Sequence, residues 1–179
     1  MDQIFIWNIT YYDILTQGIG FIGVALMFIS FQQNSNSRIL LFQIMASFVF
    51  FTHFFMLGAY SGAIINLFGA LRNIIFFNRE KKWASSILWL YAFCLIYIAM
   101  GILTWNGYIS IFPTLGMILG SLALYSERPK ITRRLSLPTS LCWITYNIFS
   151  FSIAGTICEI LSTTSIIISI IKYDRKKYS

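Results

Sequence analysis

Apolar runs follow one another along the whole chain, and each is close to the ~20 residues that a helix needs to cross a bilayer. Because no water reaches the hydrocarbon core, backbone polar groups there must bond within their own segment, so these runs predict helices. Charged residues make up 11% of the chain, and a soluble domain carries roughly twice that share. The sequence therefore predicts an integral membrane protein of the all-α class, with no room for a soluble domain.

The apolar runs predict seven transmembrane helices, which short polar or basic turns separate. They cover about residues 16–32, 39–57, 61–77, 83–103, 109–126 and 135–152, and a last one ends near residue 171. The first fifteen residues are aromatic and carry no Lys or Arg, which indicates a segment at the membrane interface, where Trp and Tyr are enriched. They also lack the basic region that begins a signal peptide, so we expect no cleaved leader.

The first three predicted helices match the last three at a constant offset of 93 residues. The matched positions share small, polar or aromatic character, and they are Phe50 with Trp143, His53 with Tyr146, Gly62 with Gly155, Asn66 with Glu159, and Arg72 with Ser165. The sequence therefore predicts one membrane domain over residues 1–179, built as two parallel three-helix repeats joined by a linker helix (3+1+3). The repeats cover about 16–82 and 109–177, and the linker helix covers about 83–103.

Lys and Arg residues occur at alternate turns. The turns after the first, third and fifth helices and the carboxyl tail hold 12 of them, the amino end and the other turns hold none, and Arg72 lies inside a helix. The positive-inside rule then predicts an amino end outside the cell and a carboxyl end in the cytoplasm. Topology thus explains the net charge of +7, and we expect no nucleic-acid partner.

Polar and aromatic side chains form stripes on the predicted second, third, sixth and seventh helices, and these stripes are expected to face the bundle interior. Aromatic rings there would stack on a ring-bearing solute, and asparagine amides would hydrogen-bond to it. The candidate solute-binding residues are Phe50, His53, Asn66, Asn73, Trp143, Tyr146, Asn147 and Glu159. An open alternative is that the asparagines and His53 only bond between helices and that the glycines only allow close helix packing.

Two ionisable residues fall within predicted helices, where a charge costs ~2.5–3.5 kcal/mol on insertion scales. Glu159 lies among apolar residues that favour its neutral acid form, so we predict a proton-coupling role for it. Arg72 lies near the basic end of its helix, and its side chain either reaches the cytoplasmic surface or belongs to the site. Arg72 and Gln32 are therefore kept as uncertain site residues.

No set of residues for catalysis is visible. The chain has one histidine and three cysteines, Cys94, Cys142 and Cys158, which stand singly in apolar runs. Such single cysteines predict buried hydrophobic side chains, not disulfides or a metal site. The sequence contains no acidic pair at depth and no glycine-rich phosphate loop, so it predicts neither an enzyme nor a metal or other cofactor.

Several residues of the first three helices carry a family resemblance. They are Phe31-Gln32, His53, Leu57-Gly58-Ala59, Gly62-Ala63, Asn66 and Arg72-Asn73. On these positions the chain resembles the YgjV family of bacterial inner membrane proteins, which implies a location in the bacterial inner membrane. The 3+1+3 plan also resembles the SWEET and PQ-loop transporters, whose name-giving motif is Pro-Gln. In this chain Phe31-Gln32 stands at the position of that motif, so phenylalanine replaces the proline. The corresponding residues of the second repeat are Tyr125-Ser126.

The sequence supports two hypotheses about function. The first is a transporter of a small, neutral or weakly charged solute, bound between the two repeats near the membrane midplane. The alternative is a non-transporting accessory or scaffold protein that uses the same polar residues for helix packing. The expected partners are the lipid bilayer and a small solute, and a homo-oligomer is left open.

Overall fold

Residues 10–31, 33, 36–126 and 128–174 are described by a computed structural model of the chain. They form seven α-helices and one short 3₁₀ helix. The elements are α1 (Tyr11–Phe31), α2 (Asn36–Met56), α3 (Tyr60–Phe77), α4 (Leu88–Leu103), η1 (Tyr108–Ser110), α5 (Ile111–Tyr125), α6 (Pro129–Phe149) and α7 (Ile153–Asp174). No strand occurs in this described part of the chain, so the predicted all-α class is confirmed for it.

Helix α1 begins earlier than the sequence analysis predicts. The amide and the hydroxyl of Thr10 donate to Asp13 Oδ2 at 2.8 and 2.7 Å, and the Asp13 amide donates to Thr10 Oγ1 at 3.3 Å. These reciprocal bonds satisfy amides that the first helical turn otherwise leaves unpaired. The predicted helix start near residue 16 is therefore wrong by five residues. The interfacial location of residues 1–15 stays a prediction, and the first nine of them lie outside the described residues.

Helices α6 and α4 also differ at their starts. Helix α6 begins at Pro129, inside the predicted basic turn, because the fixed φ of proline suits the first helical position and its missing N–H costs nothing there. Residues 83–87 were predicted as helix but form turns and irregular structure, and α4 begins at Leu88. Both differences arise at polar or basic ends, where hydrophobicity gives little information on helix limits.

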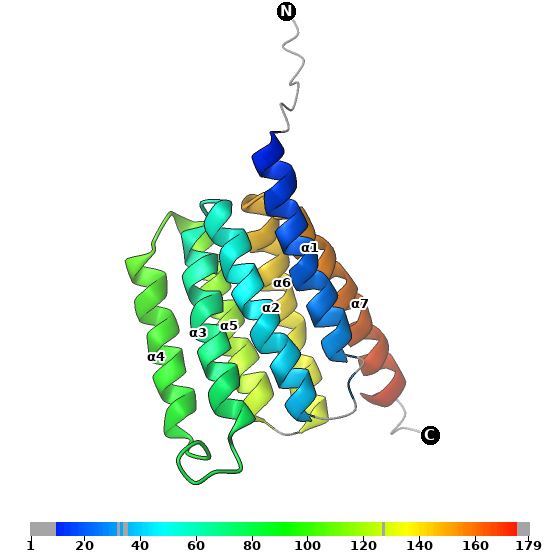
Figure 1. Ribbon diagram of the computed structural model, residues 1–179. Helices are drawn as coiled ribbons and strands as arrows, with labels where there is room; N and C mark the ends of the chain where they lie inside the picture. Colours follow the sequence, from blue (N-terminus) through cyan, green and yellow to red (C-terminus); the bar gives the residue numbers. More distant parts are fainter. Residues whose placement is uncertain (1–9, 32, 34–35, 127, 175–179) are drawn as a thin grey trace, which may run out of the picture.

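Six helices enclose the centre of the molecule (Figure 1). Neighbours in the chain pack together within α1–α3 and within α5–α7, and the ring closes because α1 packs on α7 and α3 on α5. Helix α4 lies outside this ring, against α3 and α5. Helices α1, α3, α5 and α7 run in one direction, and α2, α4 and α6 run back.

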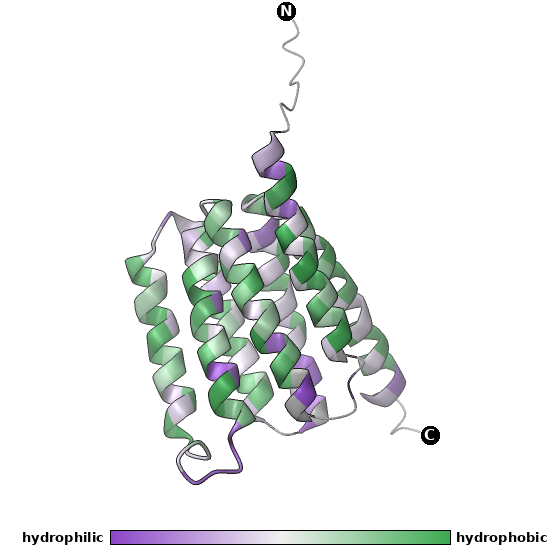
Figure 2. Cartoon of the chain, in the orientation of Figure 1, coloured by the Kyte–Doolittle hydropathy of each residue, from purple (hydrophilic) through white to green (hydrophobic). Residues whose placement is uncertain are grey.

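Four helices are long and apolar enough to cross a membrane. They are Tyr11–Ser30, Tyr60–Phe77, Tyr108–Tyr125 and Ile153–Asp174, and two shorter apolar helices span Leu40–Met56 and Leu88–Leu103. Hydrophobic residues cover most of each helix, and hydrophilic ones gather at the helix ends and in the turn between α3 and α4 (Figure 2). The chain is thus a helical membrane protein, and its seven crossings stay a prediction.

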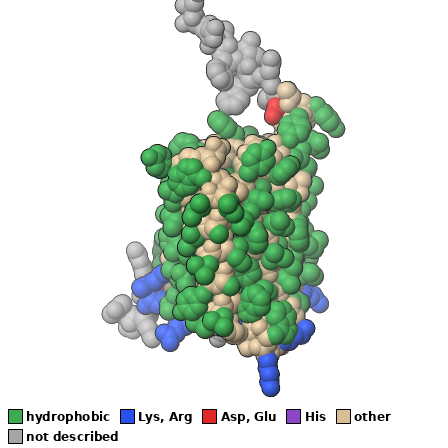
Figure 3. Space-filling view, turned by 90° about the vertical axis from the view of Figure 1, so that its left-hand side faces the viewer, with side chains coloured by type: hydrophobic (Ala, Val, Ile, Leu, Met, Phe, Trp, Pro, Cys, Tyr) green, Lys and Arg blue, Asp and Glu red, His purple; other side chains and the backbone are tan. Residues whose placement is uncertain are grey.

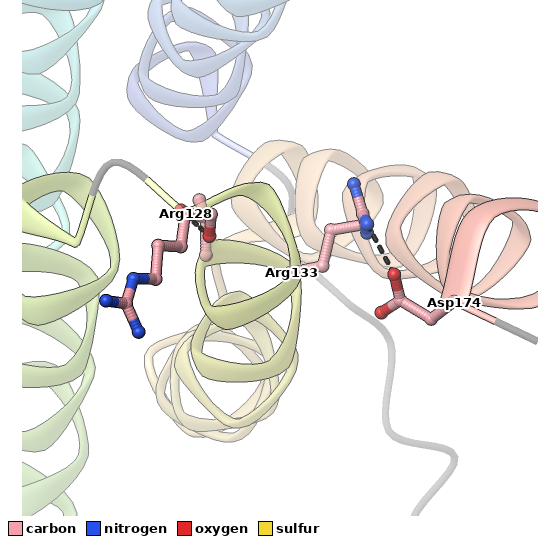
Figure 4. A network of polar contacts seen from close by, with 4 residues as sticks. Arg128, Arg133 and Asp174 are labelled. Atoms are coloured by element: carbon pink, nitrogen blue, oxygen red, sulfur yellow. Dashed lines mark hydrogen bonds and ion pairs between the residues drawn. The ribbon is translucent and has the colours of Figure 1, made fainter. Parts of the chain in front are cut away.

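Basic side chains gather at one end of the molecule, here called the basic end, where α1, α3, α5 and α7 finish (Figure 3). The other end, where α1 begins, is called the opposite end. At the basic end Arg133 of α6 forms an ion pair with Asp174 of α7, whereas Arg128 extends away from Asp174 (Figure 4). This pair fixes the start of α6 against the finish of α7.

Candidate functional site

A cavity of about 270 Å³ lies inside the ring of six helices. This volume is slightly below the range of about 300–1,000 Å³ that is typical of drug-sized ligands, so the cavity suits a small solute. Each ring helix contributes to the lining, and none of the described lining residues comes from α4. The polar lining residues are Gln43, Ser47, Asn66, Arg72, Asn73, Ser136, Thr139, Ser140, Asn147, Glu159 and Ser162.

The structure brings most of the predicted site residues to this cavity. Those that line it are Phe50, Asn66, Asn73, Trp143, Asn147, Glu159 and the uncertain Arg72. His53 and Tyr146 are not among the lining residues, and both are buried. Gln32 lies outside the described residues.

Three polar groups in the cavity have free hydrogen-bonding capacity. Asn66 Nδ2 donates to the Gly62 carbonyl at 2.9 Å, and its Oδ1 has no partner among the described residues. Asn147 is 2% exposed, and its Oδ1 is buried without a partner in the described part of the chain. Glu159 is half-buried and accepts a hydrogen bond from the Ser140 hydroxyl, which leaves a second carboxyl oxygen for a solute or a proton. The cavity wall therefore carries polar atoms that the described protein residues leave unpaired, and of these the Asn147 oxygen is itself buried.

Arg72 is held in place by two side chains and is only 7% exposed. Its Nε and Nη2 donate to Asn73 Oδ1 at 3.2 and 2.9 Å, and its Nη1 donates to Ser121 Oγ at 2.9 Å. Its side chain therefore turns into the bundle and not along the helix to the surface at the basic end.

His53 and Tyr146 each connect one half of the chain to the other near the opposite end. His53 Nδ1 lies 2.8 Å from the Thr16 carbonyl and its Nε2 lies 2.7 Å from Ser152 Oγ. Because a carbonyl only accepts, Nδ1 carries the proton and Nε2 accepts from the serine hydroxyl.

The Tyr146 hydroxyl accepts from the Gly62 amide at 2.8 Å and donates to the Ala59 carbonyl at 3.1 Å. A Cβ on Gly62 would come within 2.4 Å of the Tyr146 ring, so only glycine permits this approach. We call the His53–Ser152 and Tyr146–Ala59 contacts the two latches.

Three serines were not predicted as partners of site residues: Ser140 of Glu159, Ser121 of Arg72 and Ser152 of His53. For Ser140 a signal was present, because it lies 93 residues after Ser47 and both line the cavity. Nothing in the pattern distinguishes Ser121 or Ser152 from other small helix residues, since their roles depend on how the helices pack.

A ring of apolar helices around a partly polar cavity defines a helical membrane protein with an internal cavity. The chain belongs to the Imp-YgjV family of bacterial inner membrane proteins, which it matches over residues 14–177. It is similar to the inner membrane protein YgjV of Escherichia coli K12, with 25% identity over 145 residues, which cover 81% of this chain and 76% of that protein.

The family match confirms the resemblance to YgjV and supports a location in the bacterial inner membrane. No solved structure matches the chain. The likeness to the SWEET and PQ-loop transporters therefore stays a prediction.

Proposed function

We propose that this protein transports a small solute through the central cavity, between two parallel three-helix repeats that cross the membrane with α4 as the linker. The amino end would lie outside the cell and the carboxyl end in the cytoplasm. We propose no catalytic reaction for this protein. It is supported most strongly by the cavity, which corresponding residues of the two halves line together.

The helix directions support seven crossings. The four helices that meet the criteria of length and composition are α1, α3, η1 with α5, and α7, and these all run the same way (Figure 1). Two parallel crossings in one chain require a return crossing between them. Helices α2, α4 and α6 run back along the same bundle and are the segments available for it.

The lining of the cavity supports the repeat. Eight pairs of lining residues are separated by the offset of 93 residues that the sequence analysis found. They are Met27 with Gly120, Gln43 with Ser136, Ala46 with Thr139, Ser47 with Ser140, Phe50 with Trp143, Phe54 with Asn147, Asn66 with Glu159, and Asn73 with Ile166. A 180° rotation that exchanges α1–α3 with α5–α7 also preserves the order of helices around the ring.

The two latches support the same symmetry and suggest a gate. His53 and Tyr146 are 93 residues apart, and so are their partners Ala59 and Ser152. Each latch therefore joins the second helix of one repeat to the residue just before the third helix of the other. Breaking both, together with the hydrogen bonds of Gln17 to Phe151, Ile153 and Ala154 at the same end, would let the repeats separate there, as alternating access requires.

Burial along the cavity indicates which end is closed in this conformation. Phe54 and Asn147, near the opposite end, are each 2% exposed, whereas Gln43, Ser136 and Ile166, toward the basic end, are half-buried. We infer that the solute enters this conformation from the basic end. Glu159 would carry the proton that couples uptake or export to the proton gradient.

The alternative function is a non-transporting accessory or scaffold protein. The same two latches and the buried aromatic cluster around Phe54, Trp143 and Tyr146 would favour it if they fix one permanent conformation. A scaffold would have no solute whose binding depends on the cavity.

A substitution that fills the cavity distinguishes the transporter from the scaffold protein. A Cβ on Gly120 would lie 3.5 Å from Thr139 Cγ2, an ordinary contact, so Gly120→Leu adds bulk to the cavity without a backbone clash. Gly18→Leu is the matched control, because a Cβ there meets nothing within 4 Å. The purified protein would be screened by thermal shift against sugars, nucleosides, vitamins and amino acids, since a bound ligand stabilises the native state.

A transporter should yield a ligand that also moves across proteoliposome membranes, with binding and flux lost in Gly120→Leu and kept in Gly18→Leu. Ligands that bind Gly120→Leu as well as they bind the original protein would show that the cavity is not their site. That result would favour the scaffold.

A further inference from the structure

We propose that Arg72 is the anion-binding residue of the cavity and that the solute is a small aromatic monocarboxylate, whose carboxylate it holds. This inference rests on the proposed transport function and names its substrate class.

Arg72 is a buried cation that lacks an anionic partner. No carboxylate of the described residues pairs with it, and its three hydrogen bonds go to the neutral side chains of Asn73 and Ser121. Glu159, the other ionisable lining residue, bonds to Ser140 instead. A buried, unpaired charge is strongly unfavourable, so an anion in the cavity would supply the compensation that the described protein residues do not.

The free donors of Arg72 match a carboxylate. Guanidinium has five N–H donors, and the three bonds to Asn73 and Ser121 use one each on Nε, Nη1 and Nη2. One N–H on Nη1 and one on Nη2 remain without a partner among the described residues. Two donors on neighbouring nitrogens of a planar fork suit the two oxygens of one carboxylate.

The surroundings of Arg72 leave space for this carboxylate. Gly120 lines the cavity beside it, and a Cβ there would lie 3.9 Å from Arg72 Nη1. The glycine hydrogen therefore leaves open the side of the guanidinium that larger residues would cover.

An aromatic ring suits the part of the cavity further from the basic end. Trp143 lies against Gly116, five residues before Ser121 on α5, which corresponds to an axial distance of about 7.5 Å at the rise of an α-helix. That separation is comparable with the length of a benzoic acid. The Phe54 and Trp143 rings are stacked with centroids 6.0 Å apart, and Phe50 lines the same wall. Asn66, whose Oδ1 has no partner among the described residues, is available to a ring substituent.

The test compares benzoate with benzamide, which has nearly the same shape without the charge. Binding to the purified full-length protein would be measured by titration calorimetry and thermal shift. We expect benzoate to bind about 10- to 100-fold more tightly than benzamide, which is the range for hydrogen bonds to a charged group. Arg72→Gln should remove this preference, Arg72→Lys should retain part of it, and Lys81→Gln, which removes an exposed charge from the basic end, should leave it unchanged.

Each result that would contradict the proposal leads to a different conclusion about the substrate or the function. Equal binding of benzamide and benzoate would overturn the carboxylate assignment, and cavity-dependent binding of both would leave the transport function standing. If neither binds while the broader screen yields ligands sensitive to Gly120→Leu, the substrate class is wrong but the function is not. Benzoate binding that appears only in nanodiscs without anionic lipid would assign Arg72 to a lipid phosphate instead. The original protein alone decides the first comparison, so the test does not depend on whether Arg72→Gln folds.

Discussion

The latch at Tyr146 gives a quantitative prediction for Tyr146→Phe, which deletes one hydroxyl and keeps the ring. The deletion removes the bonds to the Gly62 amide and the Ala59 carbonyl. Ala59 still accepts from the Ala63 amide at 3.1 Å, so its carbonyl stays satisfied. The Gly62 amide is in the first turn of α3 and has no partner within the helix. We therefore expect a loss of about 1–3 kcal/mol of unfolding free energy, the cost of leaving one buried donor unsatisfied.

Tyr97→Phe is the matched control, because it deletes the same atom from a side chain that is 0% exposed. The Tyr97 hydroxyl forms no hydrogen bond of normal geometry in the described part of the chain and has only a weak contact with Ser121, so its loss should cost less than the loss of the Tyr146 hydroxyl, at most about 1 kcal/mol. Unfolding would be followed by far-ultraviolet circular dichroism during titration of mixed micelles with dodecyl sulfate. Equal destabilisation by the two substitutions, or none by Tyr146→Phe, would refute the latch.

Three further predictions concern coupling, topology and packing. Glu159→Gln should keep the fold, because Gln resembles the neutral acid, but should abolish the pH dependence of uptake in proteoliposomes; unchanged pH dependence would exclude a coupling role. A reporter fused after Ser179 should behave as cytoplasmic and one inserted in the 105–108 turn as external, and the reverse pattern would contradict the topology. Gly116→Ala should destabilise the protein by about 1–3 kcal/mol through overpacking, since its Cβ would lie 2.9 Å from Trp143 Nε1. Gly18→Ala, where the space is open, should instead stabilise the helix by about 0.5–1 kcal/mol, and a similar effect at both positions would argue against the close packing.

The presence of the seven helices could be predicted from the sequence because the apolar runs have the length of helices that cross a bilayer. Helix ends could be predicted less well, since local bonds such as those between Thr10 and Asp13 determine them. The Thr-x-x-Asp spacing was a usable signal for α1, and Pro129 was one for α6. Both signals lay outside the apolar runs from which the helices were located.

The candidate site could be predicted in outline. The repeat offset pointed to Asn66 and Glu159, which both line the cavity. It could not show that Phe50 faces the cavity while His53, three residues later, turns to Thr16 and Ser152. Helix rotation is set by packing between all neighbours, and a sequence pattern limits it only to a broad face.

Access to the cavity from both sides of the membrane is the most direct test of transport. Cys158 lines the cavity and is 6% exposed, and it is the only thiol left after Cys94→Ser and Cys142→Ser, since the chain has three cysteines. This variant would be treated with a membrane-impermeant methanethiosulfonate in right-side-out and in inverted vesicles. We expect reaction in both preparations, faster from the side of the basic end, and protection by the transported solute. Reaction from one side only, or from neither, would contradict alternating access.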